Sequence, residues 1–301
     1  MTRCWLLAIA LVSACGSKKT EDSAGSGSGS GSGSATMDSA TLAASYDKKC
    51  VAGDLEACRS LAIMYTEGVG VKQDPRRATA LFGQSCNGGN LAACNQVALA
   101  LVEGMGVEKD AAKGVDVYQK ACDGGYKLAC RNLGLMFRDG HGVTADAERA
   151  AKLLDTACQG GALFACTNAG DLDVTRNALD ASVKHYKKGC DDGDAVACRH
   201  MGIAYLEGKG LPNSVTAATV WLDRGCRADD PIACRVLGAM RVQGIGVAKD
   251  VELGRQLLKR ACDRKDTEAC TALAALPPGT GSGSATGSGS GSDPGSASGV
   301  R

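Results

Sequence analysis

The chain has 301 residues, and its 34 Lys and Arg against 33 Asp and Glu give a formal net charge of only +1 at pH 7. This balance, with no run of basic residues, argues against nucleic-acid binding, which needs a dense basic surface. Only 4% of the residues are aromatic but 16 are cysteines, so cross-links are expected to contribute much of the stability.

The first residues are typical of a bacterial export signal. An apolar stretch covers residues 4–12 and ends in Val12-Ser13-Ala14-Cys15. The stretch is too short to span a membrane permanently. Small residues directly before Cys15 resemble a lipobox, so we expect a signal peptide at 1–14 and a lipidated Cys15. A plain signal peptide is the alternative, and it would leave Cys15 as an unpaired thiol.

The residues after Cys15 bear on localisation. Gly16-Ser17 lacks the aspartate that often retains lipoproteins at the inner membrane, which favours an outer-membrane lipoprotein of the bacterial envelope. The periplasmic and surface faces both stay open. Membrane contact is expected through the lipid anchor only.

Two Gly/Ser-rich segments mark the limits of the folded part. Residues 23–36 are mostly alternating Gly and Ser, and residues 279–299 have a similar composition after two prolines. Neither segment has apolar residues with which to build a core. We therefore expect a flexible tether at 15–36, one folded domain at 37–276 and a disordered tail at 277–301.

Within the folded part, a cysteine is followed eight positions later by another seven times. Successive pairs begin 36 residues apart, except for one step of 32, so one structural unit has been repeated along the chain. The predicted pairs are Cys50 with Cys58, Cys86 with Cys94, Cys122 with Cys130, Cys158 with Cys166, Cys190 with Cys198, Cys226 with Cys234, and Cys262 with Cys270.

Each unit, written from its second cysteine, reads as two helices. Apolar residues recur at helical spacing in the first half, for example at Leu133, Met136 and Phe137. Glycines then stand where left-handed caps are needed, at Gly68, Gly104, Gly140, Gly208 and Gly244. Side chains suited to N-capping the second helix follow at Asp74, Asp110, Asp146, Ser214 and Asp250. The Gly-x-Gly loops could also suggest phosphate binding, but no strand precedes them.

The cysteine spacing predicts a turn inside each pair. Residues eight apart on one helix would lie about 12 Å apart, beyond the roughly 7 Å limit for a disulfide. Turn-forming residues such as Asp123-Gly124-Gly125 lie between the cysteines. We therefore expect each disulfide to join one helix to the start of the next. Zinc ligation is the alternative, but the spacing is not Cys-x-x-Cys, and no metal or other cofactor is expected.

The fourth unit is four residues short. It has Asp171-Leu172-Asp173 and lacks the Gly-x-Gly loop, which predicts that its first helix ends early. Two interpretations stay open, a tolerated loop deletion and a local change of curvature that shapes a binding site.

The motifs resemble a known repeat family. Leu133-Gly134-Leu135-Met136-Phe137 with Gly140-His141-Gly142-Val143, and Gly202-Ile203-Ala204-Tyr205 with Gly208-Lys209-Gly210, resemble the Sel-one-like repeat, a relative of the tetratricopeptide repeat. A cysteine pair in every unit is similar to the Helicobacter cysteine-rich proteins. The resemblance covers residues 46–275 and implies an all-α, right-handed α/α solenoid of disulfide-linked helical hairpins. Members of that family are described as adaptor-like binders and as penicillin-binding proteins with weak β-lactamase activity.

The sequence offers little for catalysis. Of the motifs of penicillin-recognising serine enzymes, only a Ser-x-x-Lys appears, at Ser45 and Lys48, and about one such match is expected by chance. His141, His185 and His200 fall on different predicted helices, so no histidine cluster is expected. A non-catalytic scaffold is favoured, with a β-lactamase-like hydrolase as the alternative.

A binding face has better support. The resemblance implies that the first helix of each unit lines a concave surface, with the residue after the second cysteine pointing into it. Guanidinium and carboxamide groups there suit the carboxylates and backbone of a protein, a peptide or a peptidoglycan fragment. The alternative is that these residues form local ion pairs. The predicted binding residues are Arg59, Asn95, Arg131, Asn132, Asn168, Arg199, His200 and Arg235.

Overall fold

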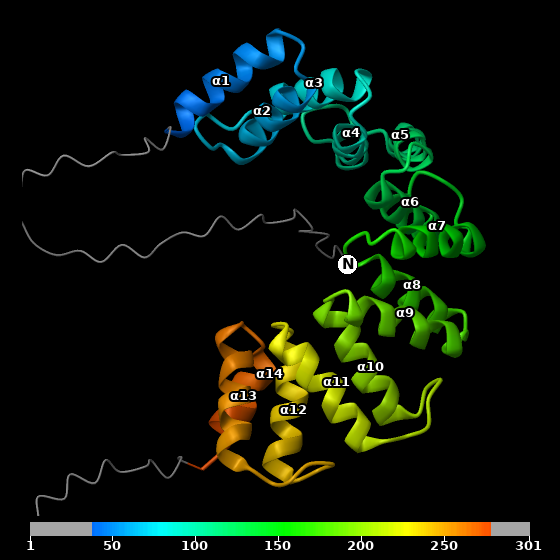
Figure 1. Cartoon of the computed structure of the whole chain (residues 1–301), viewed down its shortest axis with the longest axis vertical. Coiled ribbons are helices and arrows are strands. Elements are labelled where there is room, and N and C mark those ends of the chain that lie inside the picture. The colour runs from blue at the N-terminus through cyan, green and yellow to red at the C-terminus, as the bar shows by residue number, and fades with distance from the viewer. Residues whose placement is uncertain (1–37, 278–301) are drawn as a thin grey trace, which may run out of the picture. The chain divides into compact units, whose positions relative to one another are not determined.

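A computed structural model describes residues 38–277 of the chain. The predicted signal peptide, the lipidation site at Cys15, the tether and nearly all of the predicted tail lie outside these residues. The described residues form helices and no strands (Figure 1). The helices are α1 (Ser39–Val51), α2 (Leu55–Glu67), α3 (Pro75–Asn87), α4 (Leu91–Glu103), α5 (Ala111–Asp123), α6 (Lys127–Asp139), α7 (Ala147–Gln159), α8 (Ala165–Thr175), α9 (Leu179–Asp191), α10 (Ala195–Glu207), α11 (Val215–Arg227), α12 (Pro231–Gln243), α13 (Val251–Asp263) and α14 (Thr267–Ala274). None of the helices in 38–277 is both long enough and apolar enough to span a bilayer.

Each odd-numbered helix forms a hairpin with the even-numbered helix that follows it, and a disulfide closes every hairpin. All seven predicted cysteine pairs are bonded, with Cα atoms 4.5–4.6 Å apart, so the disulfide prediction is confirmed. In the loop-entropy description, so short a cross-linked loop stabilises the folded state by roughly 2–3 kcal/mol. The bonds join Cys50 to Cys58, Cys86 to Cys94, Cys122 to Cys130, Cys158 to Cys166, Cys190 to Cys198, Cys226 to Cys234, and Cys262 to Cys270.

The two cysteines of a hairpin lie at equivalent places in every unit. The first stands near the end of the odd-numbered helix, and the second lies in the first turn of the even-numbered helix, as predicted. Most of the second cysteines are buried, and three of them have a sulfur close to the backbone carbonyl oxygen of their own partner, at 3.5–3.6 Å. The second cysteines are Cys58, Cys94, Cys130, Cys166, Cys198, Cys234 and Cys270.

The helix ends follow the predicted capping pattern. All five cap glycines have positive φ, between 67° and 78°, and end their helices in a left-handed conformation. The predicted caps of the odd-numbered helices accept hydrogen bonds from backbone N–H groups, as from Leu253 to Asp250 at 2.9 Å. Most even-numbered helices begin at a capping Asp or Asn as well, whereas α6 and α8 have no side-chain cap.

Small residues let successive helices approach closely. A Cβ on Gly134, Gly202 or Gly238 would lie within 3.0 Å of Leu154, Leu222 or Leu258 on the next helix. Neighbouring even-numbered helices from α4 to α14 also contact one another, while within 38–277 no comparable contact joins the odd-numbered helices. We call the even-numbered helices the inner row, because they are the more closely spaced of the two.

The fourth unit differs from the prediction. Helix α8 ends at Thr175, nine residues after Cys166, just as α2 ends nine residues after Cys58. It begins at Ala165, one residue before Cys166, whereas α2 begins three residues before Cys58. The prediction that this helix ends early is wrong. The missing residues come from the following connection, which spans 176–178 where the connection after α2 spans 68–74. Ala162 stands where most other units have a capping Asp or Asn, and it has no side-chain oxygen to cap the helix. Helix α6 also lacks a side-chain cap but begins at its usual position, so the missing cap alone does not account for the late start.

Candidate functional site

Along the inner row, the residue after the second cysteine reaches the start of the next inner helix. Arg199 Nε lies 3.2 Å from Asp230 Oδ1, and Arg235 Nε lies 3.1 Å from Asp266 Oδ2. Both aspartates are also N-caps. Thr167 donates in the same way to Asp194, the N-cap of α10. These pairs join successive hairpins, so local ion pairing describes the contacts of Arg199 and Arg235.

Arg59 is also neutralised inside the chain. Its guanidinium pairs with Glu56 one turn earlier on α2, and Asn90 donates to the same carboxylate at 3.0 Å. The hydrogen bonds between the two charged groups raise the pKa of Arg59 and lower the pKa of Glu56. Arg59 therefore offers a ligand a partly satisfied charge.

Arg131 on α6 is different. Its Nε donates to Asn168 Oδ1 at 2.7 Å and Nη1 to Asn132 Oδ1 at 3.4 Å, and no carboxylate in residues 38–277 forms an ion pair with it. Burial, and then the nearby Arg138, lower the pKa of Arg131 from its ordinary value, although an arginine stays charged. Asp266 and Glu268, which pair with Arg235, lie four and two residues before Cys270. The equivalent positions before Cys166 are occupied by Ala162 and Phe164, neither of which has a carboxylate.

Carboxamides extend the site on either side of Arg131. Asn132 Nδ2 donates to Asn95 Oδ1 at 2.9 Å, and Asn95 is only 3% exposed. Asn132 also bonds the buried phenol of Tyr118, whose pKa is raised by burial. The structure thus brings four predicted site residues into one hydrogen-bonded row, the amide ladder, formed by Asn95, Asn132, Arg131 and Asn168.

The turn before α8 exposes apolar side chains. Leu163 is 54% exposed and Phe164 is 38% exposed, and Phe164 adopts a left-handed backbone with φ of 58°. A bulky side chain rarely takes this conformation without strain. The unusual turn therefore lies where the inner row lacks its capping carboxylate.

His200, another predicted site residue, faces α8. Its ring stacks on Tyr186 with centroids 4.8 Å apart, and its Nε2 lies 3.8 Å from Asp171 Oδ1. The Tyr186 hydroxyl donates to the same Asp171 oxygen at 2.8 Å. Burial is the main cause that lowers the pKa of His200, so its ring is neutral at pH 7. Polar side chains therefore extend beyond the amide ladder as far as His200 on α10.

A second histidine also meets α8, which sequence reasoning missed. His185 Nδ1 lies 2.7 Å from Asp173 Oδ2, and its Nε2 lies 3.1 Å from Asp155 Oδ1. His185 and His200 thus both meet α8, through different aspartates, because α9 and α10 both pack beside it. The sequence contained one signal of this contact. Asp173 lies seven residues after the second cysteine of its unit, where Tyr65 and Phe137 are aromatic, so a carboxylate replaces a packing residue there.

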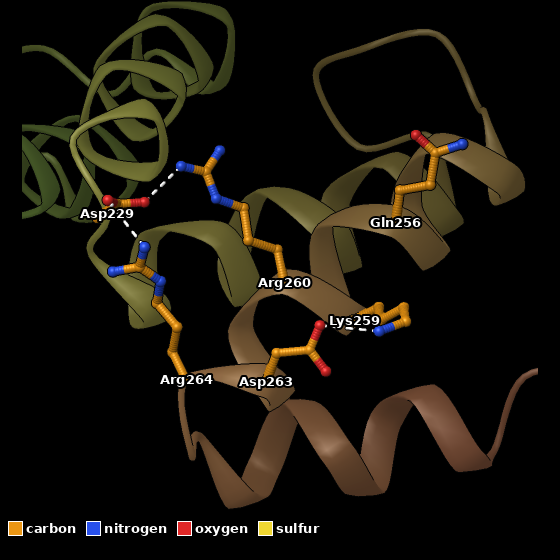
Figure 2. Close-up of a pocket in the computed structure, with 6 residues that line it drawn as sticks. All are labelled: Asp229, Gln256, Lys259, Arg260, Asp263 and Arg264. Atoms are coloured by element: carbon orange, nitrogen blue, oxygen red, sulfur yellow. Dashed lines mark hydrogen bonds and ion pairs between the residues drawn. The ribbon is translucent and has the colours of Figure 1, made fainter. Parts of the chain in front are cut away.

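The odd-numbered helices carry a separate polar pocket (Figure 2). Arg260 and Arg264 approach Asp229 from two sides, with Arg264 Nη2 2.8 Å from Asp229 Oδ2. The hydrogen bond from Arg260 is the main cause that lowers the pKa of Asp229. Lys259 pairs with Asp263 in the same pocket, so its charges are largely matched internally.

The residues of the hydrolase alternative do not form a catalytic arrangement. Ser45 and Lys48 lie one turn apart on α1, and no hydrogen bond joins their side chains within the described part of the chain. Lys48 forms no ion pair with a described residue. The contacts of Ser45 and Lys48 therefore give no support to the hydrolase alternative.

Together these features define a helical repeat scaffold that is cross-linked in every hairpin. The Sel1 repeat family matches six consecutive segments, residues 55–90, 91–126, 127–161, 163–194, 195–230 and 231–266. The chain therefore belongs to the Sel1 repeat family, as the resemblance predicted. No curated protein matches the sequence.

Several solved structures are similar. A protective antigen of uropathogenic Escherichia coli, c5321, which displays an SLR fold, is 24% identical with a TM-score of 0.68 over 77% of this chain and 50% of that chain. This chain thus matches about half the length of that antigen. A Sel1 repeat protein from Oxalobacter formigenes is 25% identical with a TM-score of 0.64 over 70% of this chain and 88% of that chain. Helicobacter pylori cysteine-rich protein B is 23% identical with a TM-score of 0.37 over 43% of this chain and 96% of that chain.

Proposed function

We propose that the protein is a non-catalytic scaffold that binds a protein or peptide through its inner row, centred on the amide ladder. Membership of a helical repeat family supports a binding role, because stacked repeats present extended surfaces and each unit contacts only its neighbours. The predicted binding residues lie on the inner helices, where an extended peptide would meet several repeats in succession.

One observation carries the proposal. Arg131 is the inner-row arginine whose hydrogen bonds go to amides, whereas Arg59, Arg199 and Arg235 each pair with a carboxylate. A guanidinium that contacts no carboxylate directly can bind an incoming one strongly, since charge-assisted bidentate bonds are among the strongest polar contacts. The neighbouring amides can then bond a peptide backbone.

The test compares partner capture by the full chain and two charge-reversed variants. Arg131→Glu is expected to lose partners that the unmodified protein retains from an envelope extract. Arg227→Glu is the matched control, because this side chain on α11 is 78% exposed and pairs only with Asp223 among the described residues. Equal capture by all three proteins would rule out the inner-row site. Purified peptidoglycan fragments form a second arm, and their Arg131-dependent retention would identify a cell-wall ligand in place of a peptide.

We also propose that the scaffold works in the bacterial envelope as an outer-membrane lipoprotein anchored at Cys15. The lipobox-like Val12-Ser13-Ala14-Cys15 supports this, and seven disulfides suit an oxidising compartment. Labelling with a radioactive fatty acid in a bacterial host tests it. Label that is present in the unmodified chain and absent from Cys15→Ala is the expected result, and equal label in both would contradict the anchor.

A further inference from the structure

We propose that the ligand of the inner row between α6 and α10 is a peptide segment with one acidic and one basic side chain two residues apart. This inference rests on the proposed function and specifies the chemistry of its ligand. It follows from two charges of opposite sign that form no ion pair with an arginine, lysine or carboxylate of the described residues: Arg131, which donates to Asn168 of α8, and Asp171, three residues further along α8.

The positive charge belongs to Arg131. Two of its nitrogens donate to Asn168 and Asn132, and amide oxygens do not neutralise a guanidinium. In other repeats the equivalent arginine meets an aspartate of the next inner helix, as Arg199 meets Asp230. Ala162 stands at that place, and Asp194 acts on Arg131 only through space, without an ion pair or a hydrogen bond, so a ligand carboxylate can supply the missing contact.

The negative charge belongs to Asp171 on α8. Its Oδ1 accepts from the Tyr186 hydroxyl and faces His200, while Oδ2 accepts no hydrogen bond from the described residues. The side chain is 41% exposed. Burial keeps the pKa of His200 below its ordinary value, so the neutral ring does not compensate the carboxylate at pH 7. Neither Lys nor Arg in 38–277 pairs with Asp171.

The positions of Asn168 and Asp171 on α8 indicate the spacing in the ligand. Asn168 accepts a hydrogen bond from Arg131 and lies three residues before Asp171, so the side chains of Asn168 and Asp171 leave the same face of α8 with their Cβ atoms roughly 5–6 Å apart. In an extended peptide, side chains two residues apart point to the same side and stand about 6.6–6.8 Å apart. The guanidinium of Arg131 lies beyond Asn168, on the side of α6, so the flexible side chains of a ligand Glu and a ligand Lys two residues apart have to span the rest of the separation between Arg131 and Asp171.

Elsewhere on the inner row the same pairing is closed within the chain. Arg235 already contacts both Asp266 and Glu268, and Arg199 and Asp230 are 16% and 5% exposed at their side chains. Ion pairs of this kind leave no uncompensated charge for a ligand. Arg131 and Asp171, on the neighbouring inner helices α6 and α8, therefore keep charges of both signs without an arginine, lysine or carboxylate partner among the described residues.

The experiment measures fluorescence anisotropy of labelled, end-blocked heptapeptides with the full chain. The probes contain Glu-Ala-Lys or Lys-Ala-Glu between glycines, and two analogues replace either Glu or Lys by Gln. We expect the better of the two orders to bind about 10-fold more tightly than either analogue. Arg131→Gln should remove the preference for Glu and keep the preference for Lys, while Asp171→Asn should do the reverse. Asp116→Asn, an exposed acid on α5, is the matched control and should change neither preference.

The outcomes separate this inference from the proposed function. Binding that needs Glu and Arg131 but ignores Lys and Asp171 would overturn the paired-charge ligand and leave a peptide scaffold in place. No measurable binding of any probe, or tighter Arg131-dependent binding of a peptidoglycan tripeptide, would also overturn it. Circular dichroism of each variant shows whether the repeats remain folded, and Arg131→Lys should retain part of the Glu preference because it keeps the charge.

Discussion

The junction between α6 and α8 and the junction between α10 and α12 are built from the same sequence positions but treat their arginine differently. At the second, Arg199 pairs with Asp230, which also caps α12. At the first, Arg131 finds no capping carboxylate, because α8 starts late and Ala162 stands at the capping position. One helix cap thus decides whether an inner-row arginine holds two hairpins together or is available to a ligand.

Removing the carboxylate at the regular junction should have the largest effect. In Asp230→Ala the side chain of Arg199, 16% exposed, loses its ion pair and Ala233 N loses its cap, so we expect a loss of about 3 kcal/mol in the free energy of unfolding. Chemical denaturation with the disulfides intact measures it. Asp250→Ala is the control, because Asp250 caps α13 and forms no ion pair with a described residue, and about 1 kcal/mol is expected. Equal losses in the two variants would show that Arg199 adds nothing to the junction.

Restoring acids at the irregular junction should convert it to the regular kind. Ala162→Asp combined with Phe164→Glu places carboxylates where Asp266 and Glu268 meet Arg235. We expect a gain of about 0.5–1 kcal/mol in stability, from a cap and a partly exposed ion pair, together with loss of peptide binding. Denaturation and the anisotropy assay measure both.

The control for this conversion is Ala162→Asn with Phe164→Gln, which supplies hydrogen-bonding groups of similar size without charge. Binding should survive in the neutral variant. If both pairs of substitutions abolish binding, the apolar turn at Leu163 and Phe164 matters more than the charge of Arg131, and the comparison of the two junctions would have to be revised.

Features that depend on local sequence were predictable. Cap glycines, capping aspartates and the turn inside each cysteine pair follow from the residues themselves, and the structure confirms them. The contacts of the arginines were not, because Arg199 and Asp230 come from successive units and their pairing depends on how the hairpins stack. The same applies to Asp171, whose neighbours Tyr186 and His200 lie on α9 and α10. The late start of α8 was missed because the absent Gly-x-Gly loop is a stronger sequence signal than the absent cap at Ala162.

The smallest expected effect concerns His200, which lies between the two junctions and faces Asp171, Arg199, Asp194, Asp230 and the ring of Tyr186. Burial lowers its pKa in the folded state below the ordinary 6.5, so the unfolded chain binds the proton more readily. The contribution of His200 to stability is therefore complete above pH 6.5 and declines as the pH falls below that value.

His200→Gln should accordingly flatten the fall in stability between about pH 7.5 and 5.5, by less than about 1.4 kcal/mol per pH unit, the limit for one proton. Denaturation midpoints across this range measure the slope, and His185 is present in both proteins, so its contacts with Asp173 and Asp155 cancel in the comparison. A steeper slope in the variant would mean that Asp171 favours the protonated ring more than burial opposes it. In that case Asp171 would be partly neutralised below about pH 6.5, and the preference for a basic side chain in the ligand should weaken at the same pH.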